Sequence, residues 1–370
     1  MSPIKRVNTR LFLMSISSSL EQAWYRHNSG ALLLLPFSWL FRGVAATRRY
    51  YHQKVAPSPS LKVPVIVVGN ITVGGTGKTP LLLALVAHFK QQGYRPGVIS
   101  RGYGGNASEY PLRVTTESAA AEVGDEPLLL ASACPVVVDP DRYRAAQFLL
   151  EQTDCDLILS DDGLQHYRLP RDIEIVVVDG GRGFGNGHCL PAGPLREPVS
   201  RLTQADFVLI NSALPNRTQP NSNDSDSSDL EPGSLNLGYL DDGIENHFQL
   251  KIEPAQFRHL VTGQQLQPQS WADSRQVHAV AGIGNPQRFS TTLEQLEFEV
   301  QLHAWPDHHD FQGDELRFDD NLPVIITAKD AVKCHGIAND KVWVLDVVAV
   351  PEPAFLNKLT DAVGRLTKSR

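Results

Sequence analysis

Cysteine is scarce in this sequence, and its spacing excludes two common architectures. The chain of 370 residues holds four cysteines, which lie far apart and form no CxxC pair. A disulfide framework or a zinc knuckle needs cysteines paired at short spacing, so neither is expected. A reducing, cytoplasmic compartment fits this usage better.

An excess of basic charge is also missing. The net charge is −7, whereas a general nucleic-acid binder needs surplus Lys and Arg to neutralise phosphates. We therefore expect no nucleic-acid partner, and nothing implies a protein partner. The average hides one asymmetry, because residues 1–54 hold eight Lys and Arg side chains against a single acid, Glu21.

This basic segment lacks an uninterrupted apolar run of membrane-spanning length. Its apolar stretch, ALLLLPFSWLF (31–41), is broken by Pro36 and followed by Arg42. Eleven helical residues reach about 16 Å, roughly half of a 30 Å hydrocarbon layer. We expect an interfacial helix with arginines facing the anionic headgroups of a membrane surface. The alternative is a helix packed on the protein's own core.

From residue 63 onward the sequence alternates between strands and helices. Apolar, β-branched runs predict strands at 63–69, 97–100, 135–139, 156–160, 173–179 and 206–211, with helices at 80–92 and 142–152. Nearly continuous apolar strands that alternate with helices indicate a parallel α/β sheet with helices on both faces.

A polar stretch then interrupts the alternation. Residues 211–236 are rich in Ser, Asn and Asp, which predicts a solvated loop, and a ribbon-like stretch follows near 247–252. Alternation resumes with strands at 277–282, 299–304, 324–327 and 342–346 and helices at 286–296 and 353–366. The expected organisation is a basic segment with a membrane-associated helix (1–54), a P-loop core (55–212), a flexible insert and ribbon linker (213–270) and a smaller C-terminal α/β domain (271–370).

The most informative motif is TVGGTGKT (72–79), between a predicted strand and a predicted helix. Backbone N–H groups of a glycine-rich turn converge on phosphate oxygens, and the helix dipole assists. Lys78 would reach the β- and γ-phosphates of ATP, and the Thr79 hydroxyl would hold Mg²⁺. Thr72 replaces the first glycine of the strict P-loop pattern, but the context outweighs this defect. The predicted nucleotide-binding residues are Thr72, Val73, Gly74, Gly75, Thr76, Gly77, Lys78 and Thr79.

Carboxylates follow in two other motifs. Asp161 and Asp162 end the predicted strand at 156–160, where a P-loop site needs carboxylates to organise Mg²⁺. The GDEP motif places Asp125 and Glu126 just before an apolar helical run. Helix capping and a base near the γ-phosphate are equally compatible with that position.

Other motifs carry side chains with two interpretations each. In SRGYGG, Arg101 and Tyr103 follow a strand at the sheet edge where ligands bind. They would clamp an anion and stack on a sugar, or form a flexible turn. Arg142 would contact a phosphate or lie on a solvated helix face. WPDHHDF (305–311) suggests zinc, a carboxylate-oriented histidine or a solvated loop. Adjacent side chains seldom converge on one metal, which favours the second of these.

Taken together, these motifs resemble the lipid A 4′-kinase (tetraacyldisaccharide 4′-kinase) family. The resemblance covers most of residues 24–340 and rests on VVGNITVGGTGKTP, SRGYGG, GDEP, DDGLQHYRLPRD, FGNGHCLPAGPLRE, AGIGNP, PDHH and TAKDAVK. It implies ATP- and Mg²⁺-dependent phosphorylation of the 4′-hydroxyl of a tetraacylated glucosamine disaccharide 1-phosphate. The implied location is the cytoplasmic face of a Gram-negative inner membrane, with peripheral or shallow attachment.

The resemblance also implies residue roles. It makes Asp125 the base and His308 its partner, with Lys78 on the transferred phosphoryl group. Asp161 and Asp162 fall at its metal-side positions. Its substrate-side or supporting positions are Arg101, Tyr103, Arg142 and Glu197. Because His308 belongs to the second predicted unit, the pair would form across a cleft between units.

Two other functions compete with this one. A membrane-docked switch NTPase would carry a second loop lysine where this chain has Val73. A P-loop kinase for a soluble metabolite leaves the basic, apolar N-terminal segment without a purpose.

Overall fold

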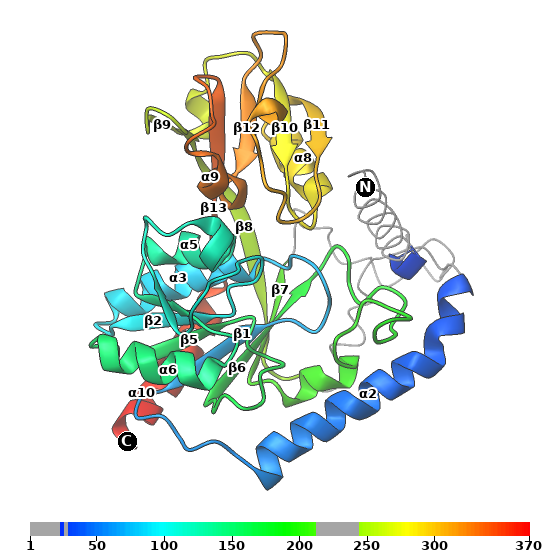
Figure 1. The fold of residues 1–370 in the computed structure, drawn as a ribbon, viewed down its shortest axis with the longest axis vertical. Coiled ribbons are helices and arrows are strands. Elements are labelled where there is room, and N and C mark those ends of the chain that lie inside the picture. The colour runs from blue at the N-terminus through cyan, green and yellow to red at the C-terminus, as the bar shows by residue number, and fades with distance from the viewer. Residues whose placement is uncertain (1–22, 26–28, 212–243) are drawn as a thin grey trace, which may run out of the picture.

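The computed structural model describes residues 23–25, 29–211 and 244–370 (Figure 1). The first 19 residues and nearly all of the polar insert predicted at 211–236 lie outside the described residues. The described strands are β1 (Val65–Gly69), β2 (Pro96–Ser100), β3 (Leu112–Val114), β4 (Val136–Val138), β5 (Leu157–Asp161), β6 (Ile173–Asp179), β7 (Phe207–Asn211), β8 (His247–His259), β9 (Gln265–Leu266), β10 (Gln276–Ala281), β11 (Glu299–Ala304), β12 (Val324–Thr327) and β13 (Val342–Pro351).

Helices connect most of these strands. The helices and helical turns are η1 (Ser29–Leu34), α2 (Leu35–Tyr50), η2 (Tyr51–Val55), α3 (Lys78–Gln91), α4 (Ala120–Val123), α5 (Asp125–Ala131), α6 (Arg142–Gln152), η3 (Val199–Gln204), η4 (Pro268–Ser270), α8 (Pro286–Gln295), η5 (Asp314–Leu316), α9 (Ala328–Cys334) and α10 (Pro353–Lys368). Local capping accounts for several starts. The Asp141 side chain accepts from the N–H groups of Tyr143 and Arg144 at the start of α6.

One mainly parallel sheet runs through the described chain, in the order β11-β10-β12-β13-β8-β7-β6-β1-β5-β2-β4-β3, with β9 beside β8. Antiparallel pairing is confined to β13 with β8, β3 with β4, and β9 with β8. The predicted parallel α/β sheet is thus confirmed. The central strands β1, β2, β5, β6 and β7 are buried along their length. Their two sides belong to separate apolar clusters, one with Leu85 of α3 and one with Leu149 of α6. Helices therefore cover both faces.

The sheet is divided between two lobes (Figure 1). The first lobe holds β1–β7 with α3, α5 and α6, and the second holds β10–β12 with α8 and α9. The long strands β8 and β13 pass between them. The ribbon predicted near 247–252 is in fact a 13-residue strand, and β13 continues to Pro351 instead of ending at 346. Only part of β8 is buried, so its polar positions concealed its length.

The C-terminal helix α10 returns to the first lobe. Its Phe355, Leu359 and Val363 are fully buried in the same cluster as Leu81 and Phe89 of α3. The boundaries predicted at 212 and 270 stay a prediction, but the segment 271–370 contributes its last helix to the core of the first lobe.

The N-terminal helix is longer than the sequence suggested. Residues Gly30–Val55 form one helical stretch of 26 residues, long and apolar enough to cross a membrane by length and composition alone. Pro36, which interrupts the apolar run, does not end the helix. Proline lies in the first turn of α2, where its missing N–H leaves no helical bond unmade. Only 11% of the most apolar window is buried against the protein, so the alternative of a helix packed on the core is not supported.

One buried hydroxyl attaches this helix to the first lobe. Ser38 Oγ donates to the carbonyl of Cys189 at 2.8 Å and accepts from the N–H of Ala192 at 3.1 Å. Leu33 and Leu40 on the same helix are 82% and 66% exposed. The helix lies along the outside of the first lobe (Figure 1).

Candidate active site

The glycine-rich turn lies where its sequence predicts, between β1 and α3. Gly77 has φ of 93° and caps α3, and a Cβ there would lie 2.6 Å from Asn211 Nδ2. Asn211 donates to the carbonyl of Thr76 at 2.8 Å, and Asn70 Nδ2 donates to that of Thr72 at the same distance. Only glycine fits at position 77, because it accepts the left-handed backbone and the close amide.

Lys78 extends from the first turn of α3 towards the end of β5. Its Nζ lies 3.1 Å from Asn70 Oδ1 and 3.5 Å from Asp162 Oδ1. Arg196 Nη1 donates to the other Asp162 oxygen at 2.8 Å. Burial alone would raise the pKa of Asp162, but Lys78 and Arg196 together hold that pKa below its usual range. Asp162 is therefore ionised at neutral pH.

Asp161 lies in a different electrostatic environment from its neighbour. Burial, with Glu126 and Asp162 nearby, raises the pKa of Asp161 to about 7. Its Oδ2 accepts from Ser100 Oγ at 2.9 Å, while its buried Oδ1 has no hydrogen-bond partner.

The donor set at this point fits Mg²⁺. Within the described ranges, no group of three or more His, Cys, Asp or Glu side chains is arranged to hold a metal ion. Mg²⁺, however, commonly takes one or two carboxylates together with substrate phosphates and water. Asp161 and Asp162 lie beside Lys78, and the unpaired Asp161 Oδ1 is an oxygen ligand with no other use.

The Asp125 and His308 side chains meet across the two lobes. His308 Nδ1 lies 3.1 Å from Asp125 Oδ2 although 183 residues separate them. Asp125 is buried in the first turn of α5, whose N-cap residue is Gly124, and its carboxylate contacts His308 and Lys333. The structure therefore brings His308 against a carboxylate, one of the arrangements that the sequence left open.

His308 adopts an unusual backbone conformation that aims its ring. Its φ is 60°, in the left-handed region that non-glycine residues seldom occupy. The ring lies 5.0 Å from that of Tyr103, and a Cβ on Gly104 would come within 3.2 Å of Nδ1. The SRGYGG loop therefore packs directly against the histidine from the first lobe.

Two lysines of α9 also contact the Asp125–His308 pair. No role was predicted for either lysine. Lys329 Nζ lies 3.1 Å from Glu126 Oε1, 3.1 Å from Asp307 Oδ1 and 3.4 Å from His308 Nε2. Lys333 Nζ lies 3.3 Å from Asp125 Oδ2. Although burial raises the pKa of Asp125, the His308 hydrogen bond and Lys333 outweigh it and leave that pKa below its ordinary value. The TAKDAVK motif could have indicated that both lysines point to the same site, since lysines four residues apart share a helix face.

The second lobe also contacts the phosphate loop. A Cβ on Gly284 would lie 3.4 Å from both Gly75 N and Asp307 Oδ2. Arg182 Nη2 donates to the Gly284 carbonyl at 3.1 Å, and Arg288 Nη2 donates to Asn211 Oδ1 at 2.6 Å. The loop that carries His308 therefore adjoins the phosphate loop, and the two halves of the predicted site form one region.

The predicted substrate-side residues fall into two groups. Arg101 and Tyr103 are exposed, with Tyr103 at 64%, so both are free to meet a ligand from solvent. Glu197 is buried and accepts from Gln165 Nε2 at 2.9 Å. Arg142 is 2% exposed. These last two have the placement of supporting residues.

Arg142 holds the backbone under the acidic pair. It donates to the carbonyls of Asp139 and Asp161, at 2.9 and 3.3 Å, and burial lowers its pKa to about 10. The interpretation of Arg142 as a residue on a solvated helix face is therefore wrong.

Because the Arg142 guanidinium is buried, we expect it to contribute to the stability of the fold. Arg142→Leu should lower the free energy of unfolding by about 2–5 kcal/mol, because it leaves buried carbonyls and carboxylates without their partner. Urea unfolding followed by tryptophan fluorescence measures this. Arg95→Leu is the control, since Arg95 pairs with Asp156 at 3.3 Å on the surface and should change stability by no more than about 1 kcal/mol. Equal losses in the two variants would contradict the assignment.

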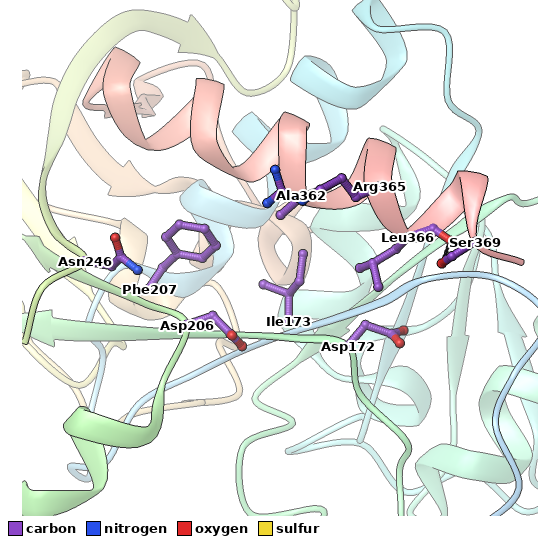
Figure 2. A pocket seen from close by; sticks show the side chains of 9 residues that line it. All are labelled: Asp172, Ile173, Asp206, Phe207, Asn246, Ala362, Arg365, Leu366 and Ser369. Carbon is purple, nitrogen blue, oxygen red and sulfur yellow. Dashed lines mark hydrogen bonds between the residues drawn. The ribbon is translucent and has the colours of Figure 1, made fainter.

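A separate pocket lies at the opposite edge of the first lobe (Figure 2). Asp172 and Asp206 lie just before β6 and β7, and Leu366 of α10 lines the other side. The phosphate loop follows the carboxyl end of the parallel strand β1, whereas these residues precede their strands. None of the predicted site residues lines this pocket.

The doubly covered parallel sheet, with a phosphate loop after a central strand, defines an α/β protein of the P-loop NTPase type. The chain belongs to the tetraacyldisaccharide-1-P 4′-kinase family, whose model matches residues 30–364. The family suggested by the sequence motifs is thereby confirmed.

Individual relatives cover nearly the whole chain. A tetraacyldisaccharide 4′-kinase of Pseudomonas fluorescens (strain SBW25) is 44% identical over 363 residues, which cover 96% of this chain and 99% of that protein. One from Pseudomonas paraeruginosa (strain DSM 24068 / PA7) is 45% identical over 346 residues, covering 93% and 96%. The crystal structure of an "apo" form of LpxK from Aquifex aeolicus in complex with ATP matches with a TM-score of 0.70 at 26% identity, covering 91% of this chain and 99% of that one.

Proposed function

We propose that this member of the family transfers the γ-phosphoryl group of ATP to the 4′-hydroxyl of a tetraacylated glucosamine disaccharide 1-phosphate during lipid A biosynthesis. The observation that carries the proposal is the Asp125–His308 contact, at 3.1 Å, on a loop that adjoins the phosphate loop. A buried carboxylate paired with a histidine near the phosphate loop supports a kinase that activates an alcohol.

On the nucleotide side, residues 72–79 would bind the triphosphate. The loop N–H groups and the start of α3 favour binding of the β- and γ-phosphates. The Lys78 ammonium lies next to this loop, near Asn70 Oδ1 and Asp162 Oδ1. Thr79, Asp161 and Asp162 would hold Mg²⁺, which supplies positive charge to the phosphate oxygens when bound. Phosphoryl transfer passes through a loose transition state, so charge neutralisation by Lys78 would matter most there.

On the acceptor side, Asp125 would take the proton of the sugar hydroxyl. The hydroxyl oxygen forms a bond to the γ-phosphorus, the bond from that phosphorus to the bridging oxygen breaks, and ADP leaves. His308 and Lys333 both approach Asp125 Oδ2, so Oδ1 is the oxygen left to accept the proton. Arg101 and Tyr103 would contact the sugar headgroup, and Arg142 and Glu197 would support the site from below.

The experiment that tests this function follows the phosphoryl group itself. Purified chain in detergent micelles is incubated with γ-³²P-ATP, Mg²⁺ and the tetraacylated disaccharide 1-phosphate, and the lipid is separated by thin-layer chromatography. We expect label in the lipid. Hydrolysis without lipid labelling would favour a nucleotide-dependent switch, and label transferred only to soluble alcohols would favour a kinase of another substrate.

The exposed N-terminal helix supports action at the cytoplasmic face of the Gram-negative inner membrane. Arg42, Arg48 and Arg49 lie on the helix that also exposes Leu33 and Leu40. Apolar side chains would enter the acyl boundary while arginines meet anionic headgroups. The helix would thus keep the site near lipids whose sugar headgroups reach the membrane surface.

The double variant Leu33→Glu/Leu40→Glu tests this attachment. We expect partitioning onto phosphatidylglycerol-containing vesicles to fall by at least about tenfold, because two exposed apolar contacts become charged. Sedimentation with vesicles measures the bound fraction. Val261→Glu is the control, since Val261 is 52% exposed on the second lobe and its replacement should leave binding unchanged. Undiminished binding of the double variant would contradict the helix's role.

A further inference from the structure

A buried pair of opposite charges lies behind the Asp125–His308 contact. Asp330 and Lys333 are one turn apart on α9, and their side chains are 0% and 7% exposed, with Lys333 Nζ 3.1 Å from Asp330 Oδ1. Burying charges is costly unless each finds a partner of opposite sign. Helix packing alone therefore does not explain why the Asp330–Lys333 ion pair is buried next to Asp125 and His308.

Lys333 joins two carboxylates that belong to different lobes. Its Nζ lies 3.3 Å from Asp125 Oδ2 in addition to the Asp330 contact, and the ring of Phe311 lies 5.2 Å away. The Lys333 ammonium of α9 thus lies between Asp330 of its own helix and Asp125 at the start of α5. Asp125 approaches the second lobe through this ammonium as well as through His308.

Asp330 is fixed by backbone and also reaches the histidine. Its Oδ2 accepts from the N–H of Gly282 at 3.1 Å and from Thr327 Oγ1 at 2.7 Å. The carbonyl of Gly282 in turn accepts from the N–H of His308 at 3.1 Å. Asp330 is therefore linked to Asp125 through the Lys333 ammonium and to His308 through the backbone of Gly282.

Lys329 determines which nitrogen of His308 carries the proton. An ammonium can only donate, so the His308 Nε2 atom 3.4 Å from Lys329 Nζ must accept. The neutral ring then carries its proton on Nδ1 and donates it to Asp125 Oδ2. His308 donates to Asp125 Oδ2, and the Lys333 ammonium lies 3.3 Å from the same oxygen. Asp125 is thus held with its other oxygen available.

We infer that Lys333 is a positioning residue that keeps Asp125 ionised and aimed, and that Asp330 anchors both Lys333 and His308. The inference rests on the proposed function, because it assumes that Asp125 takes a proton from the acceptor. The charged and titratable groups that face Asp125 are His308 from the 305–311 loop and Lys329 and Lys333 from α9, and Glu126 is its neighbour on α5. Lys329 contacts Glu126 and Asp307 at 3.1 Å, which leaves Lys333, shared between Asp330 and Asp125, as the lysine that contacts Asp125 directly.

The sign of the effect follows from the charge. A nearby cation lowers the pKa of a carboxylate, typically by about one to three units when it lies within a few ångströms. Removal of the Lys333 charge should therefore raise the pKa of Asp125. Because activity requires the carboxylate, the acidic limb of the pH profile of kcat/KM should move to higher pH.

The test is the pH profile of kcat/KM for the lipid disaccharide, measured with the full chain in detergent. Lys333→Met should move the acidic limb upward by about one unit or more, while Lys333→Arg, which retains the charge, should keep the wild-type limb. Lys341→Met is the matched control, because Lys341 Nζ donates to the carbonyl of Asp320 on the far side of the second lobe. It should leave the profile unchanged.

Folding is checked by thermal unfolding of each variant, and Lys333→Gln is the second neutral replacement, since its amide can still donate to the carboxylates. An unmoved acidic limb in either folded neutral variant would overturn the inference. Loss of folding in both neutral variants, with Lys333→Arg folded, would also overturn it, because Lys333 would then serve stability alone. Failure of the proposed function is seen separately, as absence of lipid labelling by the wild-type chain.

Discussion

Asp125→Asn should lower kcat for lipid phosphorylation by about 10²- to 10⁴-fold, the usual contribution of a positioned general base. The amide has the shape of the carboxylate but cannot take the proton of the sugar hydroxyl. The Kd for ATP should stay near its wild-type value, because Asp125 contacts His308 and Lys333 and none of residues 72–79. Steady-state kinetics together with equilibrium ATP binding separate the two effects.

A control for charge removal is available on the second lobe. Asp314 pairs only loosely with Arg317, at 3.5 Å, and its side chain is 91% exposed. Asp314→Asn should therefore leave kcat and ATP binding unchanged. Full activity of Asp125→Asn would show that another group takes the proton, and an equal loss of ATP affinity would show that Asp125 acts through the nucleotide site.

Lys78→Met is expected to have the second large effect, a fall in kcat of about 10²- to 10³-fold, as found when one donor to a developing charge is removed. The Lys78 ammonium lies among Asn70 Oδ1 and Asp162 Oδ1 at the start of α3. From there it would follow the charge that spreads over the phosphoryl oxygens in the transition state. Affinity for ATP should fall less, since the loop N–H groups and the helix dipole remain.

The distinction between ground-state and transition-state binding makes this result interpretable. Lys62→Met is the control, because Lys62 is exposed outside the phosphate loop and precedes β1. A Lys78→Met variant with wild-type kcat and a raised KM for ATP would mean that the ammonium binds substrate and transition state equally. That result would contradict the proposed role.

The strands of the sheet were largely predictable because most are buried on both faces. The bounds of β6 and β12 agree with the apolar runs at 173–179 and 324–327. The full length of β8 was not predicted, because buried positions alternate with exposed polar ones only at its start and most of its later positions are half-buried. A half-exposed strand between lobes carries too little apolar signal to reveal its full length.

The sequence predicted neither the length of the N-terminal helix nor a role for Lys333. The apolar run at 31–41 set the expected helix length, whereas the helical stretch continues to Val55, with Pro36 accommodated in the first turn of α2. The approach of Asp125 to His308 was expected from the family resemblance, since spacing alone does not encode a contact over 183 residues. Lys333 had no predicted role because its partner Asp125 comes from the other lobe.

The central claim is that Asp125 and His308, brought together from two lobes beside the phosphate loop, act as one unit. A double-mutant cycle on kcat at saturating ATP tests it most directly, using wild type, Asp125→Asn, His308→Ala and the combined variant. Residues that act as a unit have strongly non-additive effects, so the combined variant should be no more than about threefold slower than Asp125→Asn alone. Losses that multiply in full would contradict the claim, because they would show two groups acting independently.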